Sequence, residues 1–162
     1  MRRHDHAPEL LFSPSDLTRF VDAPFASWMA RYQLEVPDSG LAKDPPDPLL
    51  GYLAGKGLEH ESAFLGELRT HFTDVVSIDN RLSDTEKLEA TRAAMREGAH
   101  VIFQACLEKL PFRGYADFLI RIETPSSLGD YAYVAWDTKL AKEMKPYFVL
   151  QLCCYSEMLE AM

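Results

Sequence analysis

Residues 112–140, FRGYADFLIRIETPSSLGDYAYVAWDTKL, decide the fold of this chain. Two runs within it, 112–123 and 131–140, are rich in aliphatic and aromatic residues and predict two strands. The polar segment 126–130 between them, SSLGD, predicts the connecting turn. A third run of the same character, 100–106, precedes them, so the middle of the chain predicts a sheet.

Helical patterns surround this sheet. Ser13 and Ser83 each stand three residues before an acidic residue, as in a capping box, and predict two helix starts. Residues 50–71 and the segment beyond Pro146 also keep a helical period, and residues 74–78 predict a short strand. The expected fold class is α/β (α+β), a central mixed sheet of three or more strands flanked by helices.

The prolines divide the chain. Four of the ten fall in residues 37–48, a composition typical of a connector. We therefore expect an N-terminal helical segment with a proline-rich connector, residues 1–48, and a main body, residues 49–162, within a chain of single-domain length.

The composition of the chain predicts its cellular location. No apolar run reaches the roughly 20 residues that cross a bilayer. The start, MRRHDHAPELLF, lacks the apolar core of a secretion signal. The three cysteines are too few for a disulfide framework. We expect a cytoplasmic protein without a membrane partner.

Charge weighs against a protein that grips nucleic acid by a basic surface alone, because the net charge is −8 and the pI is about 5.1. Residues 111–145, in contrast to the whole chain, carry no net charge. They contain five basic and five acidic residues, namely Arg113, Arg121, Lys139, Lys142 and Lys145 against Asp117, Glu123, Asp130, Asp137 and Glu143. The acidic excess therefore lies outside this segment.

Three charged residues in the strand region suggest chemistry. Asp137 and Lys139 are two apart on a predicted strand, so they project from one face, about 7 Å apart. Hairpin pairing brings Asp117 of the preceding strand beside Asp137. Mg²⁺ prefers oxygen ligands and is often held by one or two carboxylates, while a lysine can orient water or offset charge on phosphorus. The other interpretation of D-x-K is a surface ion pair.

The motif order resembles the RecB-like branch of the PD-(D/E)xK nucleases over roughly residues 13–160. Gly114-Tyr115-Ala116-Asp117 is similar to that branch's G-x-A-D motif, and Asp137-Thr138-Lys139 to its (D/E)-x-K motif. Gln151 and Tyr155 fit the Q-x-x-x-Y motif of the following helix. The resemblance implies a restriction-endonuclease-like core and a nuclease that hydrolyses DNA with Mg²⁺ or Mn²⁺.

The resemblance also implies roles for single residues. Asp117, Asp137 and the Thr138 carbonyl would bind metal, Lys139 would assist hydrolysis, and Gln151 with Tyr155 would orient the substrate. A helix histidine is a further family ligand, for which His60 is the candidate. Gly57 and Gly55 lie three and five residues before His60, whereas the family has four. Glu61 could therefore share or replace the role.

Two departures from the family pattern give further expectations. The cysteines of the iron–sulfur relatives have no counterparts, so no iron–sulfur cluster is predicted. The last core strand is also missing after the Gln151 helix, which predicts a core truncated at its C-terminus. Relatives of this kind are often fused to a helicase, and we expect DNA, as single strands or ends, as the partner.

Three functional hypotheses follow. The first is a repair, recombination or defence deoxyribonuclease. The second is a non-catalytic nuclease-like module, or an inactive fragment of a nuclease-helicase, that binds nucleic acid or a partner. The third is a structural domain whose Asp137 and Lys139 form a surface ion pair. Titration with Mn²⁺ separates the first from the second, and the stability of Asp137→Asn separates the third from both.

Overall fold

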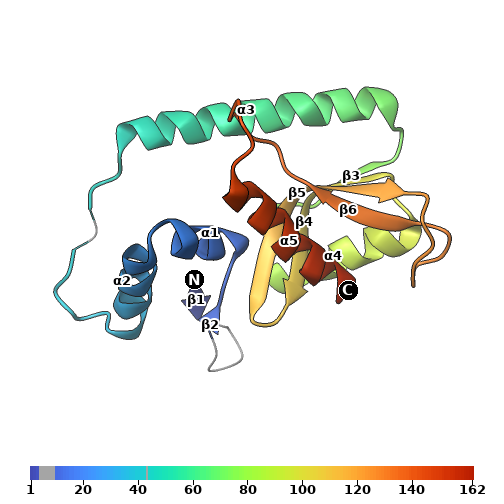
Figure 1. The fold of residues 1–162 in the computed structure, drawn as a ribbon. Coiled ribbons are helices and arrows are strands. Elements are labelled where there is room, and N and C mark those ends of the chain that lie inside the picture. Colours follow the sequence, from blue (N-terminus) through green and yellow to red (C-terminus); the bar gives the residue numbers. More distant parts are fainter. Residues whose placement is uncertain (4–9, 43) are drawn as a thin grey trace.

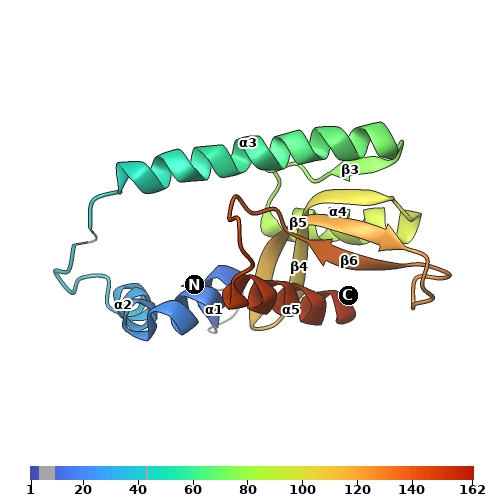
Figure 2. The same ribbon diagram turned by 45° about the horizontal axis from the view of Figure 1, so that its top comes forward.

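The computed structural model describes residues 1–3, 10–42 and 44–162. Helices flank a sheet, as Figures 1 and 2 show. The elements are, in chain order, β1 (Arg2–Arg3), β2 (Leu10–Leu11), α1 (Pro14–Asp22), α2 (Pro24–Glu35), α3 (Pro48–His71), β3 (Val75–Ser77), α4 (Asp84–Glu97), β4 (Val101–Lys109), β5 (Phe112–Ile122), β6 (Ala132–Trp136) and α5 (Pro146–Glu160).

The main sheet has the strand order β3-β4-β5-β6. β3 is parallel to β4, whereas β4, β5 and β6 are antiparallel to their neighbours. The sheet is therefore mixed, and the predicted α/β class with flanking helices is confirmed at this level. In the described part of the chain, α5 is the last regular element.

Two hydrophobic clusters hold the helices to the sheet. Leu65 and Leu68 of α3 pack with Val101, Phe118 and Ile120. α4 and α5 contribute to the other cluster, which contains Met95, Leu107, Leu119, Tyr155 and Met158. A fully buried side chain of this size contributes about 1.5–3 kcal/mol, so each cluster fixes its helices firmly to the strands.

The helix ends follow the signals in the sequence. Ser13 accepts from the N–H of Asp16, and Ser83 accepts from the N–H of Glu86, so both predicted capping boxes are confirmed. Gly98 ends α4 with φ 77°, in the left-handed conformation that suits glycine.

The N-terminal segment is joined to the main sheet by backbone hydrogen bonds. The N–H of Phe12 donates to Pro111 O at 2.9 Å, and the N–H of Arg113 donates to Phe12 O at 2.9 Å. Leu17 of α1 packs against the cluster that contains α5. These contacts bring α1 to the beginning of β5.

Helix α3 reaches beyond the sheet. Figures 1 and 2 show its first half extending away from the strands, while its second half lies along them. Leu49, Leu50, Tyr52 and Leu58 in the first half are exposed. Over the described residues, neither α3 nor any other helix has the length and apolar character needed to cross a membrane.

Candidate functional site

Asp117 lies in the middle of β5, and Asp137 directly follows the last residue of β6. The last pair of this antiparallel ladder is Phe118 with Trp136. One further step along each strand leads to Asp117 and Asp137, which puts the two carboxylates side by side, as hairpin pairing predicted. The Asp137 side chain is 5% exposed, so this pair is sheltered from water.

The predicted strand 131–140 is too long, because β6 ends at Trp136. The N–H of Thr138 donates to the Asp117 carboxylate at 3.1 Å, and the Thr138 hydroxyl lies 3.4 Å from the same oxygen. The Asp117 side chain thus accepts the hydrogen bond that a backbone carbonyl of β5 would accept if the β5–β6 ladder continued. Strand alternation therefore does not set the directions of Asp137 and Lys139.

Lys139 turns toward Asp137 nevertheless. Its Nζ lies 2.5 Å from the Asp137 carboxylate and 5.6 Å from the centre of the Phe148 ring on α5. The ammonium is therefore held between the carboxylate pair and the start of the last helix. The Lys139 amine thus approaches the two carboxylates, as predicted. An ion pair holds it there, not the alternation of side chains along a strand.

The carboxylate pair is electrostatically strained. Burial and the hydrogen bond shared with Asp137 together raise the pKa of Asp117 to about 7, although the Thr138 N–H acts to lower it. The negative charge of Glu61 acts in the same direction as Asp137. Asp117 therefore keeps its proton to a higher pH than an exposed aspartate does, because burial and the neighbouring carboxylate disfavour its charged form.

Gln151 and Tyr155 of α5 are hydrogen-bonded to each other next to β5. The Tyr155 hydroxyl donates to the Tyr115 carbonyl at 2.6 Å, and Gln151 Nε2 donates to Tyr155 Oη at 3.4 Å. Burial raises the pKa of Tyr155. The structure brings these two predicted residues together on α5, two positions along β5 from Asp117.

Gly114 makes this approach of helix and strand possible. A Cβ at that position would lie 2.6 Å from Pro14 Cδ and 3.2 Å from Tyr155 Cε1. Contacts below 3.0 Å are not tolerated without a shift, so only glycine fits between α1, β5 and α5. The glycine of the G-Y-A-D motif thus has a packing reason for its place.

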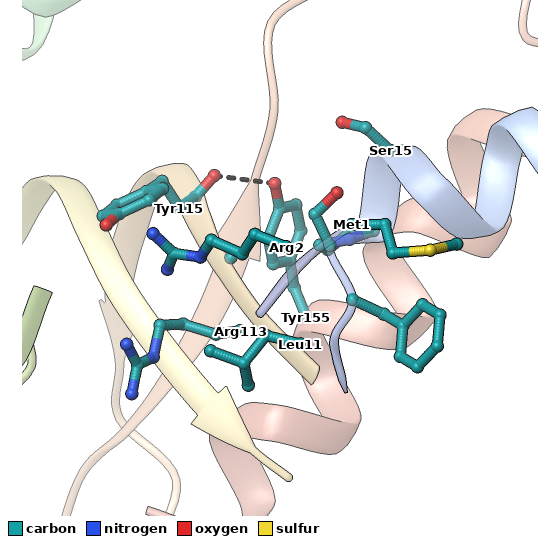
Figure 3. Close-up of a pocket in the computed structure, with 11 residues that line it drawn as sticks. Met1, Arg2, Leu11, Ser15, Arg113, Tyr115 and Tyr155 are labelled. Atoms are coloured by element: carbon teal, nitrogen blue, oxygen red, sulfur yellow. Dashed lines mark hydrogen bonds between the residues drawn. The ribbon is translucent and has the colours of Figure 1, made fainter. Parts of the chain in front are cut away.

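A hollow of about 310 Å³ opens beside Tyr155 and Tyr115, and Figure 3 shows the hydrogen bond between these residues at its side. Arg2 and Arg113 line it as well. Both guanidinium groups already pair with Asp84, so the hollow does not present two free cations to an anion.

Glu61, and not His60, is the buried residue of this pair on α3, and its charge acts on Asp117. Glu61 is 9% exposed, whereas His60 lies on the exposed side of α3. Leu65 and Leu68, which pack on the sheet, follow Glu61 by four and seven residues, the spacing of one helix face. That spacing is the sequence signal that favours Glu61 over His60.

Gln104 is a site residue that the sequence reasoning missed. Its side-chain amide donates a short hydrogen bond to the Glu61 carboxylate. In the β4–β5 register it stands opposite Asp117, between the pairs Phe103 with Phe118 and Ala105 with Ala116. Its φ is 56°, a left-handed conformation, but the string VIFQACLEK contains no glycine or other sign of this conformation.

The donor set suits a hard divalent cation. Mg²⁺ is often held by one or two carboxylates, with water completing its shell, and Asp117 and Asp137 provide two that are sheltered. In the part of the chain that the structure describes, no three histidine, cysteine, aspartate or glutamate side chains are grouped tightly enough to form a ligand set by themselves. Comparison with known protein families, curated proteins and solved structures finds no match to this chain.

Proposed function

We propose that this protein is a metal-dependent nuclease that hydrolyses DNA phosphodiester bonds with Mg²⁺ or Mn²⁺, of the RecB-like PD-(D/E)xK type. One observation carries the proposal: Asp117 and Asp137 lie side by side with Lys139 Nζ 2.5 Å from Asp137. Two carboxylates with an amine at the end of a hairpin are the groups that this hydrolysis uses.

Each residue has a chemical task in this proposal. Asp117 and Asp137 would hold the cation, and the Thr138 backbone would add a carbonyl oxygen. When bound, the cation would polarise the phosphoryl group and lower the pKa of the attacking water. Lys139 orients that water and offsets the charge that grows on phosphorus as the water oxygen bonds to it and the bond to the leaving oxygen breaks.

Gln151 and Tyr155 of α5 serve to orient the substrate in this proposal. Tyr155 is fixed to the β5 backbone through the Tyr115 carbonyl, so its hydroxyl contributes mainly to the position of the strand that carries Asp117. Gln151 is half-buried next to it and keeps amide groups that can face a phosphate. We propose Gln151 as the contact to DNA and Tyr155 as its support.

The net charge of −8 favours a second candidate, a non-catalytic nuclease-like module that binds a partner. An acidic protein gains little from phosphate contacts. The carboxylate pair favours the nuclease, because a binding module has no use for a buried carboxylate that raises the pKa of its neighbour Asp117.

A cleavage assay tests the proposal. The chain is incubated with single-stranded and double-stranded DNA in Mg²⁺, in Mn²⁺ and in EDTA. We expect products with either cation and none with EDTA. Intact DNA under all conditions, from folded protein, would favour the binding module.

A further inference from the structure

A second hollow lies between α1 and α5, apart from the one beside Tyr155. It has a volume of about 270 Å³ and is lined by Ser15, Thr18, Arg19 and Asp22 of α1 and by Tyr147 of α5. A ligand pocket usually combines apolar or aromatic walls with a few polar groups that orient the ligand. This hollow has one aromatic ring, two hydroxyl groups and two charged groups, so its lining suits a polar ligand that carries a flat ring.

Arg19 gives the hollow a positive charge in a fixed position. One of its guanidinium nitrogens donates to the buried carboxylate of Asp16 at 3.1 Å, and the Arg19 side chain is 48% exposed. A guanidinium has five N–H donors, so the bond to Asp16 orients the group and leaves donors for another anion. A phosphate is such an anion, because it accepts two parallel hydrogen bonds from an arginine.

Tyr147 supplies the aromatic wall of the hollow. Its ring packs edge-on against the Phe148 ring, with centroids 4.6 Å apart. The Nζ of Lys145, which is exposed, lies 5.6 Å from the centre of the Tyr147 ring. Because Tyr147 is only half-buried, part of its ring remains open to a second flat group, next to a lysine.

Phe148 connects the hollow to the candidate cation site. Lys139, which pairs with Asp137, lies 5.6 Å from the centre of the Phe148 ring, and Phe148 contacts Tyr147. A single side chain therefore stands between the amine of the site and the ring of the hollow. A polymeric substrate cut at the carboxylate pair would reach Tyr147 with a neighbouring unit.

Charge and shape favour a single nucleic-acid strand as the occupant. The chain has a net charge of −8, but residues 139–148 contain three lysines and one glutamate, and phosphates are attracted to such a segment. Proteins that bind single strands combine basic groups with aromatic rings on which bases stack. In a duplex the bases are stacked on and paired with each other, so only an unpaired base has a face free for Tyr147.

We propose that the hollow between α1 and α5 binds one unpaired nucleotide of a DNA strand, next to the position of cleavage. Its base stacks on the Tyr147 ring, and its phosphate is bound by Arg19 and Lys145. Asp22, the acidic residue of the lining, accepts a hydrogen bond from an amino group of the base, as carboxylates do from cytosine. The inference rests on the proposed function for the choice of DNA as ligand, and it goes further by giving a single strand a binding site of its own.

Fluorescence anisotropy of a labelled oligodeoxycytidylate in EDTA measures binding without cleavage. Tyr147→Ala should weaken binding by about tenfold or more, the usual effect of removing a stacking ring, whereas Tyr147→Phe keeps the ring and should bind nearly as the parent does. Tyr52→Ala is the matched control and should leave binding unchanged. Tyr52 is exposed on α3 and also has a lysine over its ring, with Lys56 Nζ 5.9 Å from the ring centre.

Arg19→Gln tests the phosphate contact. On a single strand, each lost contact lowers the slope of log affinity against log salt concentration by about 0.7, and we expect this change for Arg19→Gln. Arg81→Gln is the matched control and should keep the slope of the parent, because Arg81 also pairs with an aspartate, Asp79, but does not line the hollow. Thermal unfolding checks the fold of each variant, since Arg19 also binds Asp16.

The outcomes separate the inference from the proposed function. Cleavage by the parent, together with parent-like binding by folded Tyr147→Ala and Arg19→Gln, refutes the inference and leaves the nuclease proposal standing. Equal affinity of the parent for a duplex and for a single strand refutes it as well. Binding that depends on Tyr147 and Arg19, without cleavage in Mn²⁺, supports the inference and overturns the nuclease. A folded parent that binds no single strand overturns the inference, and one that also cuts no DNA in Mn²⁺ overturns both.

Discussion

The backbone N–H of Thr138 donates to the Asp117 carboxylate at 3.1 Å, which ties the chain just after β6 to the side chain of β5. Through this bond Asp117 fixes the start of the segment that carries Lys139. It also holds its own carboxylate beside that of Asp137. The same contact therefore ends the strand and assembles the site.

Lys139→Ala should nearly abolish cleavage. Loss of a preorganised group that stabilises developing charge lowers the rate by on the order of 10²–10³. Initial rates on single-stranded DNA in Mn²⁺ measure the effect. Lys142→Ala is the matched control, since Lys142 is exposed in the same segment. Equal activity of Lys139→Ala and the parent would contradict the role of the amine.

The metal-free protein should lose stability as the pH rises from about 4 to about 7. The pKa of Asp117 is raised by burial to about 7 in the folded protein, against an ordinary value of 3.8. Its stabilising protonation is complete below the ordinary value and is lost as the pH passes through the raised one. Denaturant unfolding at pH 4, 5, 6 and 7 measures the slope.

Asp117→Asn should remove this part of the pH dependence. Asp79→Asn is the control, because the hydrogen bond from Arg81 lowers the pKa of that exposed carboxyl to about 2, below the tested range. An unchanged slope in Asp117→Asn would show that another group titrates there.

Gly114→Ala should lower the free energy of unfolding by about 1–3 kcal/mol, the usual effect of overpacking. The added methyl meets Pro14 and Tyr155. Gly66→Ala on α3 is a control of opposite sign: its Cβ meets nothing within 4 Å, and replacing a helical glycine stabilises by about 0.5–1 kcal/mol. A neutral Gly114→Ala would mean that α1 is not fixed against β5.

Tyr155→Phe should destabilise the fold by about 1–3 kcal/mol, because the Tyr115 carbonyl is left without the hydroxyl that donates to it at 2.6 Å. Tyr147→Phe, near the start of the same helix, should change stability by less than about 0.5 kcal/mol. Equal values for both variants, by denaturant unfolding, would argue against the helix–strand bond.

Much of the fold can be predicted from short-range signals. The capping boxes at Ser13 and Ser83 and the stop at Gly98 depend on residues close in sequence, and all three are confirmed. The pairing of Asp117 with Asp137 follows from hairpin register, which the turn between the strands largely sets.

Other features of the site depend on contacts between distant segments. The end of β6 at Trp136 depends on a bond from Thr138 to a side chain 21 residues earlier. The choice of Glu61 over His60 depends on which face of α3 packs against the sheet. The left-handed Gln104 has no local signal at all, since glycine or asparagine would be expected there.

Calorimetric titration of the metal-free protein with Mn²⁺ tests the central claim most directly. The parent should bind the ion, Asp117→Asn should weaken binding by about tenfold or more, and Asp130→Asn, in an exposed turn, should leave it unchanged. A folded parent without binding, or equal affinities for the parent and Asp117→Asn, would contradict the claim that the paired carboxylates seat a divalent cation.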